Sequence, residues 1–343
     1  MVKKKTKKYT SKKLKTPFAS TKKNSRTVSS DIKTISFEKA CSDFKLLQSV
    51  DVHSVGAGAV LHSARVGNPV MDYYFLKARL HTKTKRGISY YEWIKTPWQQ
   101  NESEYRMYKF NLAQGKNPEQ ARYGVFRLYY GATQGFKPLI AKWLYSLYAP
   151  KVAILDFSSG WGGRCLAAMA LDIPYIGIDT NISLRPIYEK MVRELSLAIN
   201  TNNNNNNNNK FQVTMIFKDA AKVNYANYDY DMVFTSPPYF KKLRFLEVYP
   251  HMPHYSSKDD FNARFLFPVI RDTFKHLKQG GTFAINISED AFQDLRRHEP
   301  RLLPTKLHAK HRLFIQPRFA KGNPVNPETQ YKEYIYIWKK YKY

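Results

Sequence analysis

The residues with the clearest chemistry form a short segment that follows an apolar run. They are Ser236, Pro237, Pro238 and Tyr239, and the apolar run is 230–234. An aromatic amine is a poor nucleophile, because its lone pair is delocalised into the ring. Acceptors aimed at its hydrogens favour negative charge on the nitrogen, and the Ser236 hydroxyl and the Pro237 carbonyl could supply them. Tyr239 could stack on a base that is flipped out or single-stranded. The segment therefore suits group transfer to an exocyclic amine.

A second group of residues could bind a nucleotide-like cofactor. Gly160, Gly162 and Gly163 follow the apolar residues 152–155. Glycines at these positions permit a tight turn and a close approach of the backbone to a ligand. The short Gly-x-Gly is not specific by itself, since it lacks the third spaced glycine of a dinucleotide fingerprint. It indicates a ligand site only in combination with other residues.

Acidic residues end three successive predicted strands, at Asp156, Asp179 and Asp219. An acid about twenty residues after the glycines can accept hydrogen bonds from both hydroxyls of a ribose, and Asp179 has this spacing. Asp219 could accept a hydrogen bond from an adenine amino group. Each acid alone could equally cap a turn or a helix. Because parallel strands end at one edge of a sheet, the three acids together predict one shared crevice.

These residues need a sheet to position them. Apolar runs predict strands at 152–155, 175–178, 213–217, 231–234, 282–287, 313–316 and 333–338. Helical stretches are predicted at 138–147, 164–171, 184–199 and 261–277. This alternation predicts an α/β fold with a mostly parallel seven-stranded sheet and helices on both faces. The last two strands leave almost no room for a helix between them, so we expect an antiparallel edge.

With these elements in place, residues 136–340 resemble the S-adenosylmethionine-dependent amino-methylating DNA methyltransferases, which modify N4 of cytosine or N6 of adenine. The family's catalytic motif is Asp/Asn/Ser-Pro-Pro followed by an aromatic residue, and Ser236 to Tyr239 is similar to it. The resemblance implies a Rossmann-like class I methyltransferase fold. It also implies S-adenosyl-L-methionine as the cofactor and DNA, or alternatively RNA, as the partner.

The resemblance also implies roles for single residues. In the family, the acid-glycine turn holds the methionine part of the cofactor, and the next two strand ends hold the ribose and the adenine. Carried over, the cofactor-binding residues are Phe136, Asp156, Gly160, Gly162, Asp179 and Asp219. Phe136 belongs to the run 134–138, which is similar to the family's remaining cofactor element, and would pack at the cofactor.

The choice of target is less determined. In this family, serine at position 236 favours cytosine N4, with adenine N6 as the close alternative and an RNA base as a further one. Serine there also argues against methylation of glutamine in release factors. Methylation of cytosine C5 needs a cysteine nucleophile, but Cys165 falls in the helix predicted after the glycine turn. A nucleic-acid-binding subunit without catalysis is the other hypothesis, against which the intact motif argues.

Charge points to a nucleic-acid partner. The chain of 343 residues has 56 Lys or Arg against 27 Asp or Glu and a net charge of +29. Residues 1–30 contain eleven Lys or Arg and no acid, so the remainder still has a charge of +18. A basic tail alone does not explain this excess, which favours nucleic acid over an anionic membrane. In the loop 240–260 we predict that Lys241, Lys242 and Arg244 hold a phosphate backbone.

Composition divides the chain into three parts. Residues 1–30 are predicted to be a disordered basic tail, and 31–135 a small N-terminal domain for substrate recognition or an accessory role. Residues 136–343 form the predicted methyltransferase domain, in which the eight asparagines 202–209 are a loop insertion. Two cysteines suggest neither a disulfide framework nor a cysteine-rich zinc site, and we predict no metal.

Two further expectations concern location. No apolar run approaches the roughly 20 residues of a membrane span, and the N-terminus lacks the apolar core of a secretory signal. We therefore expect an intracellular protein, in the nucleus or the cytoplasm, wherever its DNA lies. The oligomeric state is not readable from the sequence.

Overall fold

The structure is a computed structural model. It describes residues 31–53, 65–200, 211–238, 253–298, 301–313 and 333–341, together with the short paired segments 240–241, 244–245, 247–248, 319–320 and 323–324. Several predictions fall outside these residues: the tail 1–30, the asparagine tract 202–209, Tyr239 and Lys242.

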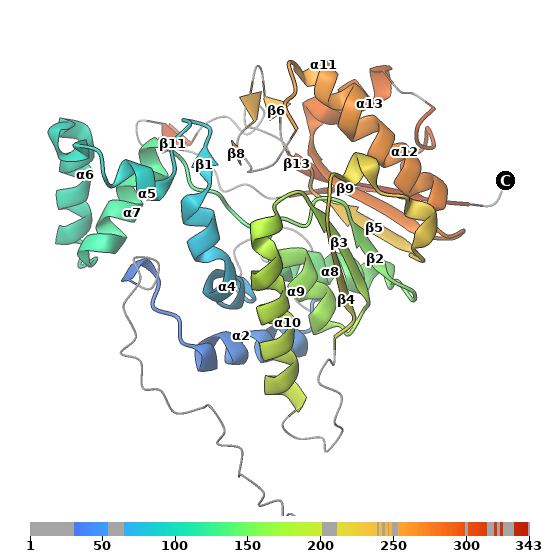
Figure 1. Cartoon of the computed structure of the whole chain (residues 1–343), viewed down its shortest axis with the longest axis horizontal. Helices are drawn as coiled ribbons and strands as arrows, with labels where there is room; N and C mark the ends of the chain where they lie inside the picture. Colours follow the sequence, from blue (N-terminus) through green and yellow to red (C-terminus); the bar gives the residue numbers. More distant parts are fainter. Residues whose placement is uncertain are drawn as a thin grey trace, which may run out of the picture.

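A seven-stranded sheet lies at the centre of the fold (Figure 1), with the strand order β10-β13-β9-β5-β2-β3-β4. Its strands are β2 Ile154–Asp156, β3 Tyr175–Asp179, β4 Val213–Phe217, β5 Met232–Thr235, β9 Thr282–Ser288, β10 Ala309–Arg312 and β13 Glu333–Lys339. Neighbouring strands from β9 to β4 pair in parallel, whereas β13 runs antiparallel to both β9 and β10. The predicted fold class, a Rossmann-like mixed sheet with antiparallel pairing at one edge, is confirmed.

Six of the seven predicted strands have bounds within two residues of the structure. The strand predicted at 313–316 lies almost wholly outside the described residues. The chain also pairs with β13 at Ala309–Arg312, where no strand was predicted. This segment is polar and alternates between half-buried and exposed residues. An edge strand with one solvated face needs no apolar run, so the apolar pattern did not mark it.

Helices cover both faces of the sheet (Figure 1). One face packs against α8 Pro138–Tyr148, α9 Gly163–Ala170, α10 Arg185–Asn200, α2 Phe37–Ser49 and α4 Asn68–His81. The other packs against α12 Phe267–His276 and α13 Glu289–His298. Because successive strand residues point to opposite faces, Ile154 belongs to the first cluster and Leu155 to the second.

A third apolar cluster lies away from the sheet. Its helices are α5 Tyr90–Trp93, α6 Glu102–Ala113 and α7 Pro118–Tyr129, and the last part of α4 joins it through Leu76 and Leu80 (Figure 1). Thus α2 and α4 share the core of the sheet, whereas α5 to α7 pack mainly with one another. The domain boundary at residue 136 stays a prediction.

The remaining elements in the described residues are short. They are β1 Lys83–Thr84, β6 Phe240–Lys241, β7 Arg244–Phe245, β8 Glu247–Val248, β11 Phe319–Ala320, β12 Asn323–Pro324, α11 Lys258–Phe261, a π-helical segment Asn262–Leu266 and the 3₁₀ helices Trp98–Gln100, Ile182–Leu184, Ala220–Lys222 and Tyr225–Asn227. The predicted helix 261–277 is therefore continuous, but it contains the π-helical section Asn262–Leu266. Such sections are frequent at functional sites. Among the described helices, none has the length and apolar character needed to cross a membrane.

Candidate functional site

The carboxyl ends of β2, β3 and β5 meet at a cavity of about 1500 Å³. The predicted site residues that line it are Phe136, Gly160, Asp179, Ser236, Pro237 and Pro238. Three others do not line it: Asp156, Gly162 and Asp219. A cavity thus lies at the predicted strand ends, but some of the predicted cofactor-binding residues do not line it.

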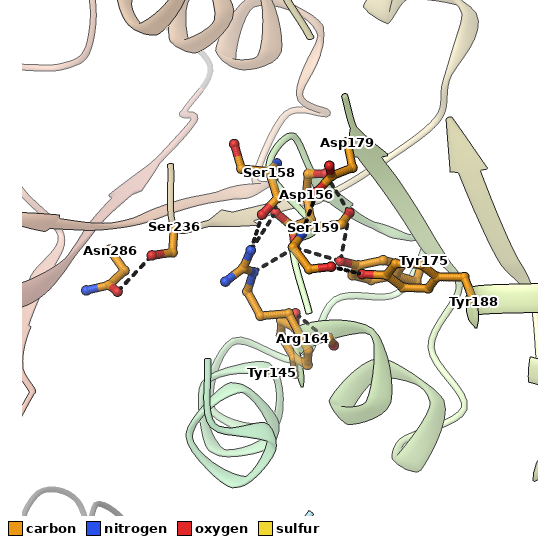
Figure 2. A network of polar contacts seen from close by, with 11 residues as sticks. Tyr145, Asp156, Ser158, Ser159, Arg164, Tyr175, Asp179, Tyr188, Ser236 and Asn286 are labelled. Atoms are coloured by element: carbon orange, nitrogen blue, oxygen red, sulfur yellow. Dashed lines mark hydrogen bonds and ion pairs between the residues drawn. The ribbon is translucent and has the colours of Figure 1, made fainter. Parts of the chain in front are cut away.

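Asp156 is fully buried, and its carboxylate accepts hydrogen bonds from the surrounding residues (Figure 2). Arg164 donates from Nε at 2.6 Å and from Nη2 at 3.3 Å, and the Tyr175 hydroxyl donates at 2.6 Å. The backbone N–H of Ser158 donates at 3.2 Å. A carboxylate has about four acceptor sites, so these four hydrogen bonds use the whole acceptor capacity of Asp156. These contacts favour a role for Asp156 in fixing the turn, and its role at the cofactor stays a prediction.

Arg164 is the centre of the same network. It also donates to the carbonyl of Ser158, and its guanidinium lies 5.4 Å from the centroid of the Phe136 ring. Burial disfavours the charged guanidinium, but the neighbouring Asp156 carboxylate outweighs that effect and raises the pKa of Arg164. The buried pair thereby connects the turn after β2 to the residue predicted to pack at the cofactor.

The two glycines of the turn have different surroundings. Gly160 has a φ of 58°, and a β-carbon there would meet only the Ser158 carbonyl oxygen, 3.8 Å away. Gly162 has a φ of 76°, and a β-carbon there would collide with the ring of Phe75 on α4. Gly160 therefore presents bare backbone to the cavity, whereas Gly162 allows close packing between the turn and α4. The role of Gly162 at the cofactor stays a prediction.

Asp179 ends β3 and faces the cavity. It accepts a hydrogen bond from the N–H of Gly160 at 2.8 Å and one from the N–H of Asn181 at 2.8 Å, through different oxygens. Burial raises the pKa of Asp179 to about 6, against the opposing effect of those two N–H groups. With two of about four acceptor sites used, two remain, which matches the two donors of a ribose diol.

Asp219 follows β4 and caps the 3₁₀ helix Ala220–Lys222, accepting from the N–H of Ala221 at 3.0 Å. Its neighbours Lys218 and Ala220 line the cavity, but Asp219 does not. The contacts thus favour capping over the predicted hydrogen bond to adenine, because the carboxylate is directed at the backbone.

Ser236 is held by a residue from the neighbouring strand. Its hydroxyl donates to Oδ1 of Asn286 at 3.2 Å, and Nδ2 of Asn286 donates to the Tyr334 carbonyl at 3.1 Å. The second bond fixes the orientation of the amide, so Oδ1 faces Ser236. The Ser236 proton is thereby directed at Asn286, and the oxygen lone pairs are left to accept. Figure 2 shows this pair beside the Asp156 network, with no bond drawn between the two.

Aromatic side chains form another wall of the cavity. Tyr255, Phe261 and Phe265 line it together with Pro238. The ring centroids of Tyr255 and Phe261 are 5.2 Å apart, and those of Phe261 and Phe265 are 5.3 Å apart and stacked. Such surfaces are suited to the face of a base.

Sequence reasoning missed Asn286 and these aromatic residues, although a sequence pattern marks Asn286, Phe261 and Phe265. Asn286 is 1% exposed and is a polar residue inside the apolar strand β9, and a buried amide needs specific partners. Phe261 and Phe265 are four residues apart, which is the spacing of one helix face.

The predicted phosphate-binding residues are only partly described. The backbones of Lys241 and Arg244 pair in the β6–β7 hairpin, while Lys242 and Tyr239 lie outside the described residues. Their roles stay predictions. Within the parts of the chain that the structure covers, no three His, Cys, Asp or Glu side chains gather as metal ligands.

No protein-family model and no curated protein sequence matches the chain. Solved structures with a similar fold include TrmN from Thermus thermophilus, at 17% identity and a TM-score of 0.36, with 59% of this chain and 48% of that chain covered. An S-adenosylmethionine-dependent O-methyltransferase from Thermotoga maritima has 16% identity and a TM-score of 0.38, with 62% and 68% covered. NSun6 from Pyrococcus horikoshii, solved with SFG, has 17% identity and a TM-score of 0.38, with 62% and 54% covered.

At these identities the similarity concerns the fold alone. The aligned part spans about half the length of TrmN, at 48% of that chain. The strand order defines a Rossmann-like α/β fold. Its antiparallel strand, β13, lies between β9 and the edge strand β10.

Proposed function

We propose that this protein is an S-adenosylmethionine-dependent methyltransferase that modifies an exocyclic amino group of a nucleic-acid base, with cytosine N4 in DNA as the first candidate. One observation carries the proposal: Ser236, Pro237 and Pro238 share a cavity with Gly160 and Asp179. Groups suited to activating an amine thus lie next to groups suited to binding a nucleoside.

The residues on the β2–β3 side fit the nucleoside part of this cofactor. Gly160 leaves space where any other residue would place a β-carbon, and Asp179 keeps acceptor capacity for the ribose hydroxyls. Phe136 lines the same space and could pack against the cofactor. Once bound, the cofactor supplies a methyl group on a sulfonium, which is reactive enough that no strong general base is needed.

The residues on the β5–β9 side act on the amine. Ser236 Oγ accepts a hydrogen bond from one N–H, because its own proton is directed to Asn286, and the Pro237 carbonyl accepts from the other. Both acceptors increase electron density on the nitrogen as the new bond to carbon forms. The nitrogen then releases one proton to solvent. Tyr255 and Phe261 could hold the base by stacking, in addition to the role predicted for Tyr239.

The finer choice of target rests on the family resemblance of Ser236, which favours cytosine N4 over adenine N6. The amine chemistry at Ser236 does not depend on the sugar of the nucleotide. An amino group of an RNA base is therefore the second candidate, and the experiment must include RNA.

The proposal is tested by incubating the purified protein with methyl-deuterated S-adenosylmethionine and four substrates: single- and double-stranded DNA and RNA of mixed sequence. Nucleosides are then analysed by mass spectrometry. We expect a deuterated methyl group on an exocyclic amine, in DNA first, and its loss in the Ser236→Ala variant. A methylated adenine or an RNA amine would keep the chemistry and correct the target. No labelled nucleoside from any substrate would reject the proposal and favour a binding subunit without catalysis.

A further inference from the structure

The cavity continues beyond the proposed methyl-transfer site, between α4, α7 and the segment before α8. Residues of the N-terminal part that line this extension include Lys33, Asp72, Arg79, Gln120, Tyr123 and Arg127. None of them has a role in the binding of a cofactor or the activation of an amine. The extension therefore has room for a different part of a substrate.

A buried charged pair lies in this extension. Asp72 and Arg79 are two turns apart on α4, and they are 7% and 6% exposed. Arg79 Nη2 bonds to one oxygen of Asp72, and Lys33 Nζ bonds to the other. Among the described residues, the Nε of Arg79 has no hydrogen-bond partner. An unsatisfied N–H on a buried cation is costly, so an acceptor that reached this N–H would stabilise the site.

The surroundings of Arg79 are strongly basic. Among the described residues between 31 and 137, those that line the cavity include six Lys or Arg and one acid. The cations are Lys33, Lys39, Arg65, Arg79, Arg127 and Lys137, and the acid is Asp72. Most of these cations are exposed at the rim, whereas Arg79 is buried. Arg65 and Lys137 are close enough that their repulsion, added to the larger effect of burial, lowers the pKa of Lys137. Anions relieve both the repulsion and the unsatisfied donor.

We propose that this extension binds phosphates of an unpaired polynucleotide strand next to the target base, with Arg79 as the buried ligand and Arg65 and Arg127 as rim ligands. The inference rests on the proposed function, because it assigns the path of the same substrate. Arginine suits this role, since its donors match the oxygens of a phosphate. A recess between helices admits a single strand, whereas a duplex needs an open surface.

The test measures binding of fluorescent 12-nucleotide strands to the full-length protein by anisotropy, over a series of salt concentrations. The Arg65→Gln/Arg127→Gln variant removes two exposed cations, so its fold should be intact. We expect affinity to fall about tenfold or more and the slope of log affinity against log salt to decrease by about 1.4, at roughly 0.7 for each single-strand phosphate contact. Matched DNA and RNA strands form two arms, and a preference for either identifies the polymer that supplies the phosphates.

The control variant is Lys95→Gln/Lys109→Gln, which removes two exposed cations outside the cavity lining. It should bind both strands like the unchanged protein. Arg79→Lys keeps the charge beside Asp72 but removes the planar fork, and we expect weaker strand binding with unchanged cofactor affinity. If the Arg65/Arg127 variant keeps the affinity and salt slope of the control, the inference is wrong.

The experiments distinguish a failure of this inference from a failure of the proposed function. Strand binding that depends on Arg65 and Arg127 without any methyl transfer would support the inference and reject the enzyme activity. Methyl transfer with an unchanged KM for the strand in the Arg65/Arg127 variant would support the enzyme and reject the inference.

Discussion

The turn after β2 and the turn after β5 leave neighbouring strands at the same edge of the sheet, but their polar groups have different partners. At the first turn, Arg164 and Tyr175 both donate hydrogen bonds to Asp156, and all three side chains are buried. In the second turn, Ser236 donates to Asn286 and lines the cavity, so its oxygen can still accept a hydrogen bond. The acid that is most conspicuous in the sequence therefore has a structural role. The group that faces a substrate is oriented by a residue outside the motif.

The largest effect should come from the first turn. Asp156→Asn leaves the buried guanidinium of Arg164 without its counter-charge, and breaking one side of such a pair costs about 3–5 kcal/mol. We expect the free energy of unfolding to fall by this amount, measured by urea denaturation followed by circular dichroism. Ser158→Ala is the control, because Ser158 contributes backbone groups to the network. If the Asp156→Asn variant keeps its stability and selectively loses cofactor binding, Asp156 contacts the cofactor directly.

Substitution beside the second turn should lower the rate of methyl transfer more than the stability of the fold. Asn286→Ala removes the acceptor that orients the Ser236 hydroxyl, so the hydroxyl can turn its proton toward the amine. We expect the single-turnover rate at saturating cofactor to fall about 10- to 100-fold, somewhat less than the loss of a whole catalytic hydrogen-bonding group.

A double-mutant cycle distinguishes this positioning role from general damage. If Asn286 acts through Ser236, then Asn286→Ala should have little further effect on the rate in the Ser236→Ala background. Asn286→Asp keeps an acceptor for Ser236 and should recover part of the rate. Fully additive losses would show that Asn286 acts independently of Ser236.

A smaller effect should appear in the pH dependence of cofactor binding. Burial raises the pKa of Asp179 to about 6, so its carboxylate is ionised at pH 8 and becomes protonated as the pH falls through 6. Protonation removes acceptor capacity for the ribose hydroxyls. Cofactor affinity, measured by calorimetry between pH 5 and 8, should therefore weaken below pH 6, by at most about tenfold per pH unit. Asp179→Asn should bind weakly with a flat profile, and a flat profile in the unchanged protein would contradict this role.

The sheet was predictable because its central strands are buried on both faces and appear as continuous apolar runs, such as Thr282–Ser288. The polar edge strand Ala309–Arg312 was not predicted, because its pairing with β13 leaves no local apolar pattern. The joining of α2 and α4 to the core of the sheet was also not readable. It depends on contacts such as those of Phe44 and Phe75 with residues far along the chain.

At the site, Ser236, Pro237 and Pro238 lie at the predicted edge of the sheet. The sequence could not say which of the predicted acids face the cavity. Asp156 and Asp179 end adjacent strands and look alike in the sequence. They differ only because Arg164 and Tyr175 surround the first, whereas the second bonds to backbone N–H groups and keeps an open side.

The central claim is that the two sides of the cavity perform separate parts of one methyl transfer. The most direct test measures both the cofactor Kd and the single-turnover rate at saturating cofactor in Asp179→Ala and Ser236→Ala. Asp179→Ala should raise the Kd and leave the saturated rate close to that of the unchanged protein. Ser236→Ala should leave the Kd unchanged and lower the rate by about 100-fold or more. If both substitutions alter the same quantity, the division of the cavity into a cofactor side and an amine side is wrong.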